Sequence, residues 1–152
     1  MALTVLPLAK LKECAGEERT SDWLEITQEM INGFADCTGD HNFIHVDPER
    51  AKTGPFGGTV AHGFLTLSLL SRLAATAIWL PEGVKDVLNY GLNRVRFIRP
   101  VPSGSRIRSV MKLAGVEERE HGRVLITIHH TLLVEGSDMP ALTAEWLSLC
   151  LT

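Results

Sequence analysis

The sequence predicts an α+β fold in which an antiparallel sheet wraps around one central hydrophobic helix, and two observations support this. Residues 61–80 contain too many apolar positions for a one-sided amphipathic helix, so most faces of this helix should be covered. From residue 87 onward, apolar and polar residues alternate in segments that turn residues separate. One buried helix followed by a run of strands is typical of a two-layer domain.

A short helix and a long loop precede the core helix. Apolar residues at three- and four-residue spacing predict a helix over residues 27–38, with Thr27 as its N-cap. Residues 38–59 are rich in Gly, Asp, Asn and Pro and predict an ordered loop, in which Asp47 and Pro48 begin one helical turn. Loops of this length are more often functional than idle.

The core helix is predicted over Ala61–Leu80, and Pro81 and Gly83 end it. This stretch approaches membrane-spanning length, yet it carries His62, Arg72 and several hydroxyl side chains. We therefore expect a helix buried in protein, and no membrane partner.

Four strands follow the core helix. The segments PVPSGS, EEREHG and EGSDMP are short enough for hairpins, so successive strands should pair antiparallel. The hotdog fold matches this plan, and because it leaves a sheet edge exposed, we expect a homodimer that covers the edge. The strands are predicted at Leu88–Arg99, Arg106–Glu118, Val124–Glu135 and Ala141–Leu151.

Size and composition limit the classes of function. With 152 residues and 45% hydrophobic content, the chain can form one core, so a single domain over residues 1–152 is expected. The net charge of −3 gives no support for nucleic acid as a partner.

The cysteines and the N-terminus indicate a reducing compartment. Cys14, Cys37 and Cys150 are odd in number and lack CxxC spacing, which argues against a disulfide framework or a zinc site. Each is expected to be a small buried apolar residue. Residues 1–10 lack a charged n-region and an adequate apolar run, so we expect no export and predict a cytoplasmic location.

Asp40 and His45 are the candidate catalytic residues. They lie five residues apart in a loop that Gly39 opens, so their side chains can converge without a helix or strand period fixing their directions. A carboxylate and an imidazole together can hold and deprotonate water. The alternatives are an aspartate that caps a turn and a histidine packed against the core.

Gly63 is the candidate oxyanion donor. It places a residue without a side chain at the start of the core helix, where backbone N–H groups lack partners and the dipole favours negative charge. A thioester carbonyl that becomes an enolate would be stabilised there. Alternatively, Gly63 only lets the helix pack closely against a strand.

The segment from Phe34 to Ser68 carries a spaced series of motifs: Phe34-Ala35, Thr38-Gly39-Asp40, Asn42, Ile44-His45, Asp47, Phe56-Gly57 and Ala61-His62-Gly63. This series resembles that of the MaoC-like hotdog proteins, and in particular the (R)-specific enoyl-CoA hydratases known as hydratase 2. The resemblance extends over most of the chain at the level of the fold.

The resemblance implies (R)-specific hydration of trans-2-enoyl-CoA to (R)-3-hydroxyacyl-CoA, or the reverse dehydration. It implies that Asp40 and His45 share one water, that Asn42 orders the substrate site, and that the Gly63 N–H polarises the thioester carbonyl. It implies no metal and no redox cofactor, because coenzyme A enters only as part of the substrate.

Three other functions remain open to the sequence. The closest is a 3-hydroxyacyl thioester dehydratase of fatty-acid elongation, with acyl carrier protein or coenzyme A as the carrier. A non-catalytic thioester-binding hotdog subunit is the second, and the retention of Asp40 and His45 argues against it. A hotdog thioesterase is the third, and it lacks an evident separate carboxylate for hydrolysis.

Phe43 departs from the family motif, which has proline at this position. This departure resembles the nodulation protein N-like branch of the family. A large aromatic residue between Asn42 and His45 is expected to alter the shape of the loop and the size of the pocket.

Four further polar residues lie near these motifs. His41 is expected in an exposed part of the loop, and His62 is expected to have a structural role at the helix start. Ser68 and Ser71 lie on the core helix, where they either line an acyl pocket or bond to their own helix backbone.

A basic interval lies between Asp86 and Glu117, where no acidic residue occurs. It forms either a face that binds the phosphates of coenzyme A or an acidic carrier protein, or a solvated strand face. Alternation predicts that two of its arginines face solvent while Val95 and Phe97 face the core. The basic residues are Arg94, Arg96, Arg99, Arg106, Arg108 and Lys112.

Overall fold

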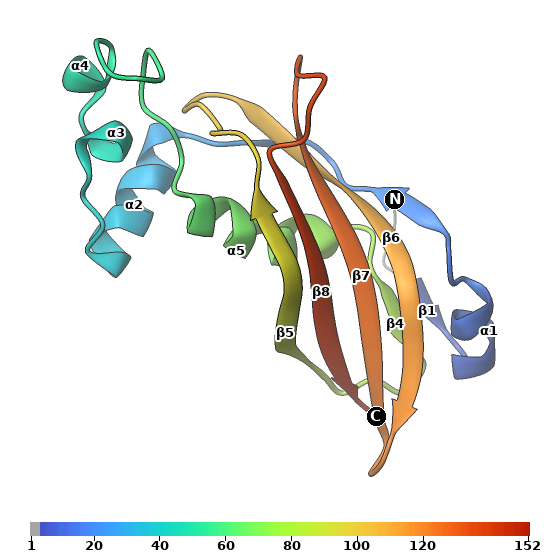
Figure 1. Cartoon of the computed structure of the whole chain (residues 1–152). Coiled ribbons are helices and arrows are strands. Elements are labelled where there is room, and N and C mark those ends of the chain that lie inside the picture. Colours follow the sequence, from blue (N-terminus) through green and yellow to red (C-terminus); the bar gives the residue numbers. More distant parts are fainter. Residues whose placement is uncertain (1–3) are drawn as a thin grey trace.

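The computed structural model describes residues 4–152 as an antiparallel sheet that wraps around helix α5 (Gly63–Ala74), as Figure 1 shows. This arrangement is the hotdog fold, so the predicted fold class is confirmed. Residues 1–3, which belong to the N-terminal segment predicted not to direct export, lie outside the described residues. In the part of the chain that is described, no helix is long and apolar enough to cross a membrane.

The main sheet has the strand order β2-β6-β7-β8-β5, and β3 also pairs with β6. The four predicted strands are all present. A smaller parallel sheet joins β1 to β4, and α1 (Leu8–Glu13) follows β1. The strands are β1 (Thr4–Leu6), β2 (Glu18–Thr20), β3 (Leu24–Glu25), β4 (Trp79–Pro81), β5 (Asp86–Phe97), β6 (Arg106–Arg119), β7 (Arg123–Val134) and β8 (Leu142–Leu151).

One predicted hairpin is wrong. Strands β6, β7 and β8 pair in succession, as expected, but β5 pairs with β8 at the far edge of the sheet and not with β6. The PVPSGS segment therefore crosses between the two edges. Its backbone bonds to the residues before α5 instead of closing a hairpin between β5 and β6: Ala61 donates to Val101 at 2.8 Å and Ser103 donates to Thr59 at 2.9 Å.

The core helix is shorter than predicted. It ends at Ala74, and Trp79 and Leu80, which were expected to be helical, belong to β4 beside β1. Ala75 donates to the carbonyl of Ser71 and closes the last helical turn, and Ala77 donates to the carbonyl of Ala74 in the turn that follows. Pairing with the N-terminal strand thus overrides the continuous apolar pattern, which periodicity alone cannot assign to helix or strand.

The long loop contains the elements that position the site. Helix α2 (Gln28–Thr38) begins where the side chain of Thr27 accepts from Met30, as predicted. The loop then forms two single-turn helices, α3 (Phe43–Val46) and α4 (Pro48–Ala51). Asp47 caps α4, so the predicted turn is confirmed, whereas α3 was not predicted.

His130 is a titratable group buried in the core. Its ring lies on β7, 1% exposed, with Nδ1 2.9 Å from the Ser109 hydroxyl and Nε2 without a described partner. Burial, helped by the nearby charge of His129, lowers the pKa of His130 from 6.5 to about 4. The neutral ring is therefore the form that the native state keeps.

Acid should destabilise the protein through His130. Below pH 6.5 the unfolded chain takes up a proton that the folded ring refuses until about pH 4, so the free energy of unfolding falls across this window. The loss should total on the order of 3 kcal/mol. Urea unfolding at several pH values measures it. A His130→Phe variant should lose this part of the pH dependence, and an unchanged slope would contradict the assignment.

Two expectations about surface residues are wrong. Cys150 is buried, as predicted, and its pKa is raised by burial to about 11, but Cys37 is exposed and Cys14 only half-buried.

The alternation of β5 is broken by a bulge at Arg94, whose φ is +51°. Val95 still packs on the core, whereas Phe97 is 48% exposed.

The basic interval does not form one face. Because β5 and β6 lie at opposite sides of the sheet, its residues separate into two groups. On β6, Arg106 pairs with Glu135 and Arg108 stacks on Trp23 at 4.5 Å. Arg99 follows β5 and donates to the Ser137 hydroxyl. The basic residues therefore do not lie along one strand face, and contact of any of them with the phosphates of coenzyme A stays a prediction.

Candidate active site

His45 lies on α3 with one ring nitrogen fixed by the backbone. Its Nδ1 is 2.6 Å from the carbonyl oxygen of Val60. A carbonyl only accepts, so Nδ1 carries the proton, and Nε2 of the neutral ring keeps a free lone pair. The side chain is 9% exposed. His45 thus has the tautomer that a general base needs.

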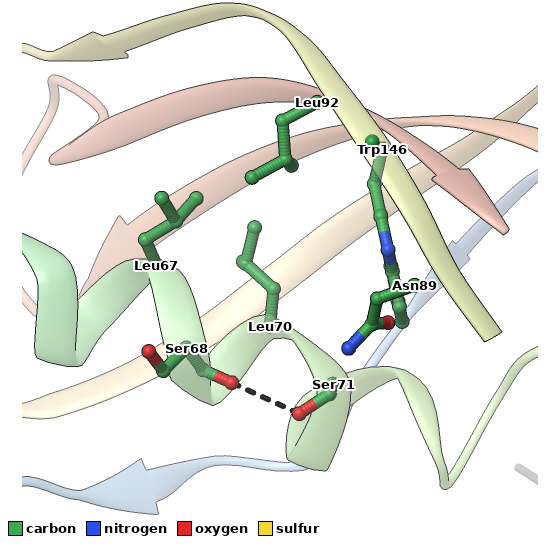
Figure 2. A pocket seen from close by; sticks show the side chains of 8 residues that line it. Leu67, Ser68, Leu70, Ser71, Asn89, Leu92 and Trp146 are labelled. Carbon is green, nitrogen blue, oxygen red and sulfur yellow. Dashed lines mark hydrogen bonds between the residues drawn. The ribbon is translucent and has the colours of Figure 1, made fainter.

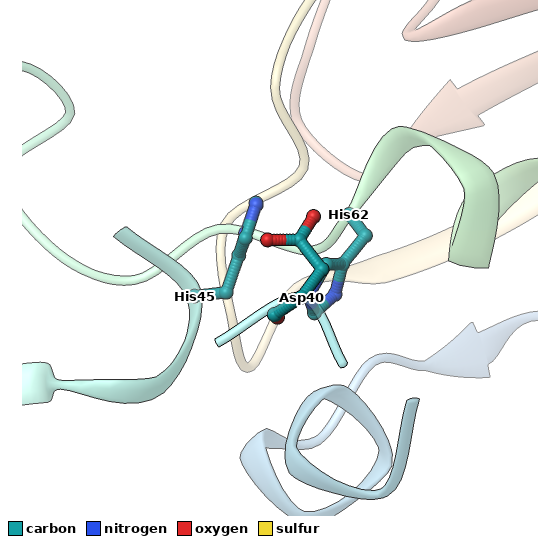
Figure 3. Close-up of side chains that lie close together, drawn as sticks. All are labelled: Asp40, His45 and His62. Carbon is teal, nitrogen blue, oxygen red and sulfur yellow. The ribbon is translucent and has the colours of Figure 1, made fainter. Parts of the chain in front are cut away.

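Asp40 lies in the short connection between α2 and α3, close to His45. Gly39, in the left-handed conformation with φ of +79°, ends α2 and turns the chain toward the site. The Asp40 side chain is exposed, and its Oδ1 is 3.4 Å from the Asn42 N–H. One ligand atom each of Asp40, His45 and His62 lie within 4.8 Å of one another, and Figure 3 shows the three side chains together.

Asn42 holds the short helix that carries His45. Its side-chain oxygen accepts from the Ile44 N–H at 3.3 Å and caps α3. The cap fixes the start of α3, and the predicted role of Asn42 in ordering the substrate site stays a prediction.

Gly63 is the first residue of α5, as the sequence predicts. Its N–H has no acceptor within the helix because the first turn lacks preceding carbonyls. A Cβ built on Gly63 would lie 3.0 Å from Cδ1 of Phe97 on β5. Close packing of Gly63 against β5 is therefore confirmed, and its role as an oxyanion donor stays a prediction that close packing does not exclude.

A cavity of about 270 Å³ joins His45 to Gly63. Its walls are mostly apolar, and Arg99 is the charged residue among the lining side chains. Such a cavity suits an acyl group whose carbonyl meets the start of α5. The lining residues are Ile44, His45, Phe56, Val60, Ala61, Gly63, Thr66, Phe97, Ile98, Arg99, Pro100 and Val101.

Asp40, His45 and His62 could hold a metal ion only after their side chains rearranged. The rings of His45 and His62 are stacked with centroids 3.8 Å apart and planes inclined by 27°. Their lone pairs lie in nearly parallel planes and do not converge on one point. Turning a ring would break the hydrogen bond to Val60 or to Asp40. This geometry favours a bound water over a tetrahedral metal site.

Phe43 does not line the cavity that contains His45. Its ring lies under the guanidinium of Arg50, 4.0 Å from the ring centroid, and contacts Gly54. Phe43 therefore contacts α4 directly, and its expected effect on loop shape and pocket size stays a prediction.

A second cavity of about 460 Å³ lies between α5, β5 and β8. Figure 2 shows Ser68, Ser71, Asn89 and Trp146 among its lining side chains. Both serine hydroxyls also bond to helix carbonyls, Ser68 to Phe64 at 2.8 Å and Ser71 to Ser68 at 2.9 Å. The predicted bonds to the helix backbone are therefore confirmed, and a role of this cavity in holding an acyl group stays a prediction.

Two other histidines near the motifs behave differently. His41 is exposed, as predicted, and its bond to Asp36 raises its pKa. His62 precedes α5, as predicted, but it is 3% exposed and lies inside the site.

Gln28 was not predicted to belong to the site. Its side chain donates to the carbonyl of His45 at 2.7 Å and accepts from the Thr59 hydroxyl at 2.6 Å. It thereby joins α2 to α3 and to the segment before α5. Nothing local in the sequence distinguishes it from any other polar residue in the first turn of a helix.

The hotdog fold and this histidine–aspartate site define a class of small thioester-binding domains, and comparison with known proteins identifies the family. A family model described as "MaoC like domain" matches residues 11–134. The chain belongs to this MaoC-like family, as its motifs predicted.

Two named relatives cover nearly the whole chain. The 3-hydroxyacyl-thioester dehydratase Z of Mycobacterium tuberculosis (strain H37Rv) is 55% identical over 139 residues, 91% of each chain. Nodulation protein N of Rhizobium leguminosarum is 44% identical over 146 residues, 95% of this chain and 91% of the relative. The predicted likeness to nodulation protein N is therefore confirmed.

Solved structures agree on the fold. An (R)-hydratase from Pseudomonas aeruginosa aligns with a TM-score of 0.72 at 23% identity, over 95% of this chain and 85% of its own. The (R)-hydratase from A. caviae gives a TM-score of 0.72 at 22% identity, over 88% and 94%.

Proposed function

We propose that this protein adds water to trans-2-enoyl thioesters and releases (R)-3-hydroxyacyl thioesters, with coenzyme A as the carrier, in a reversible hydro-lyase reaction. The observation that carries the proposal is the fixed Nδ1–H tautomer of His45, beside the carboxylate of Asp40 and in one cavity with Gly63. Membership of the MaoC-like family supports the same reaction class.

In the proposed mechanism, Asp40 and His45 bind one water between them. Nε2 of His45 takes a proton as the water oxygen bonds to C3 of the substrate. The electrons of the double bond move toward the thioester carbonyl, and the N–H of Gly63 stabilises the enolate oxygen. Nε2 of His45 then gives that proton to C2 on the same face, which breaks the N–H bond, re-forms the thioester carbonyl and restores the neutral ring. Asn42 contributes to the substrate site by holding α3 in place.

Dehydration is the same chemistry in reverse and has its own support. The relative at 55% identity is named for 3-hydroxyacyl thioesters, which are the products of hydration. The active site stabilises one transition state for both directions, so the residues named above would serve either. Neither a metal nor a redox cofactor enters a step of this mechanism.

Hydration of crotonyl-CoA and longer trans-2-enoyl-CoA substrates tests the proposal. Loss of the enoyl absorbance together with chiral analysis of the product should give (R)-3-hydroxyacyl-CoA. An (S) product would overturn the stereochemical assignment. No turnover at any chain length would favour an acyl carrier protein substrate or a non-catalytic thioester-binding subunit, and enoyl thioesters of carrier protein would then separate these two.

We also propose that the protein is a homodimer paired through β5. This edge strand presents a row of large apolar side chains to solvent: Val87 is 40% exposed, Leu88 50%, Tyr90 64% and Leu92 44%. Exposed apolar edges are avoided in monomers because they promote association. A second copy would cover this row and also the open side of the larger cavity, which Leu92 lines.

Charge on this edge should separate the subunits. In the Leu88→Asp variant a carboxylate would be buried in the proposed interface, so sedimentation should show a monomer where the wild type is a dimer. Met139→Asp is the matched control, because Met139 is 51% exposed but lies in the β7–β8 connection. A wild-type monomer, or a Leu88→Asp dimer of unchanged affinity, would contradict the interface.

A further inference from the structure

His62 has no role in the proposed chemistry, yet it contacts both residues of the proposed catalytic pair. It is the N-cap residue of α5, but its side chain makes no cap hydrogen bond. Instead, Nε2 lies 2.9 Å from the main-chain carbonyl oxygen of Asp40. Because that oxygen only accepts, Nε2 carries the proton. Nδ1 is buried and has no partner among the described residues.

The ring of His62 is held between two other rings. One face stacks on His45 with centroids 3.8 Å apart, and Phe34 of α2 lies 5.0 Å away in a tilted arrangement. A buried polar ring that leaves a nitrogen unpaired costs free energy relative to an apolar residue. A residue needed only to begin α5 would more simply be Ser, Thr or Asp, which cap helices well.

We infer that His62 is a positioning residue that holds Asp40 and His45 in register with the Gly63 N–H; this inference rests on the proposed function. The N–H of Nε2 fixes the backbone of Asp40, and the stacked ring fixes the plane of His45. The backbone of His62 leads directly into Gly63, so one residue links the water-binding pair to the oxyanion donor. Reactive geometry depends on such links, since a misplacement of about 1 Å can cost on the order of a hundredfold in rate.

Two substitutions separate the two contacts of His62. His62→Phe keeps a ring against His45 but removes the donor to Asp40. His62→Gln keeps an N–H near the position of Nε2 but removes the ring. His62→Ala removes both contacts and measures their sum.

The kinetic test compares these variants with wild type on crotonyl-CoA, with the melting temperature measured in parallel. For His62→Ala we expect kcat to fall about ten- to a hundredfold with little change in KM, because positioning acts on the transition state. His62→Gln and His62→Phe should each recover part of that loss. Wild-type kcat in His62→Ala, or a loss of kcat that follows the melting temperature without recovery in either conservative variant, would overturn the inference.

A second readout does not depend on turnover. Long-range proton–nitrogen NMR of the histidine rings reports which ring nitrogen is protonated. We expect the Nε2–H tautomer for His62 and the Nδ1–H tautomer for His45 in the wild type. A different tautomer of His62 would overturn the inference even in an inactive protein. Correct tautomers without crotonyl-CoA hydration would instead retain the positioning role and remove the proposed substrate.

Discussion

Asp40→Asn and His45→Asn should each remove most of the hydration activity while leaving the fold intact. Asparagine at position 40 keeps an oxygen for the Asn42 N–H but loses the negative charge that orients water. At position 45, the asparagine amide can still donate to the Val60 carbonyl, while the free lone pair of Nε2 is lost. General acid–base assistance typically contributes about a hundred- to ten-thousandfold, so kcat should fall by that order.

The double variant decides whether the two residues act on one water. If they do, Asp40→Asn with His45→Asn should be little worse than either single change, because the second substitution has no remaining water geometry to damage. Multiplying losses would show separate roles. His41→Ala is the matched control: this exposed histidine lies in the same loop, bonds to Asp36, and should leave kcat and KM at wild-type values. Activity retained in either single variant would refute the mechanism.

The sequence predicts the fold well where a pattern is local. The cap at Thr27, the turn at Asp47 and the strands that became β6, β7 and β8 each follow from spacing or turn chemistry. The position of β5 is different, because its partner is decided by where the chain crosses after Phe97, and a short proline–glycine segment is equally compatible with a hairpin or a crossover. The end of α5 likewise depends on β1, which is remote in sequence.

The candidate site likewise contains residues that the sequence identifies and residues whose role depends on packing between distant elements. Asp40 and His45 could be found because a glycine-rich loop with acidic and imidazole groups is unusual and matches a family motif. His62 belongs to that motif, but its contacts with Asp40 and His45 depend on how α2, α3 and α5 meet. No sequence motif or spacing distinguishes Gln28 from other polar residues at the start of a helix. Roles that arise from packing between distant elements become visible only when those elements are placed in space.

Gly63→Ala should strongly reduce the hydration activity. Two explanations must be distinguished: loss of access to the Gly63 N–H, and a steric clash with Phe97. The new methyl group would lie beside the N–H that is proposed to meet the thioester carbonyl, in a cavity already bounded by Phe97. An oxyanion donor is typically worth about a hundred- to a thousandfold, and a donor that the carbonyl can no longer reach should cost a comparable amount. KM for crotonyl-CoA and kcat measure the loss.

Packing is the competing explanation, because the methyl would also lie 3.0 Å from Phe97 Cδ1 and 3.1 Å from Cε1. Phe97→Ala removes that contact, so the comparison to make is Gly63→Ala with Phe97→Ala against Phe97→Ala alone. If Gly63 serves only packing, these two proteins should be equally active. If the carbonyl must approach the N–H, activity should still differ about a hundredfold.

The double variant should meanwhile be the more stable of the two, because alanine is favoured over glycine in a helix by up to about 1 kcal/mol. Lower activity with higher stability would identify Gly63 as a residue retained for chemistry.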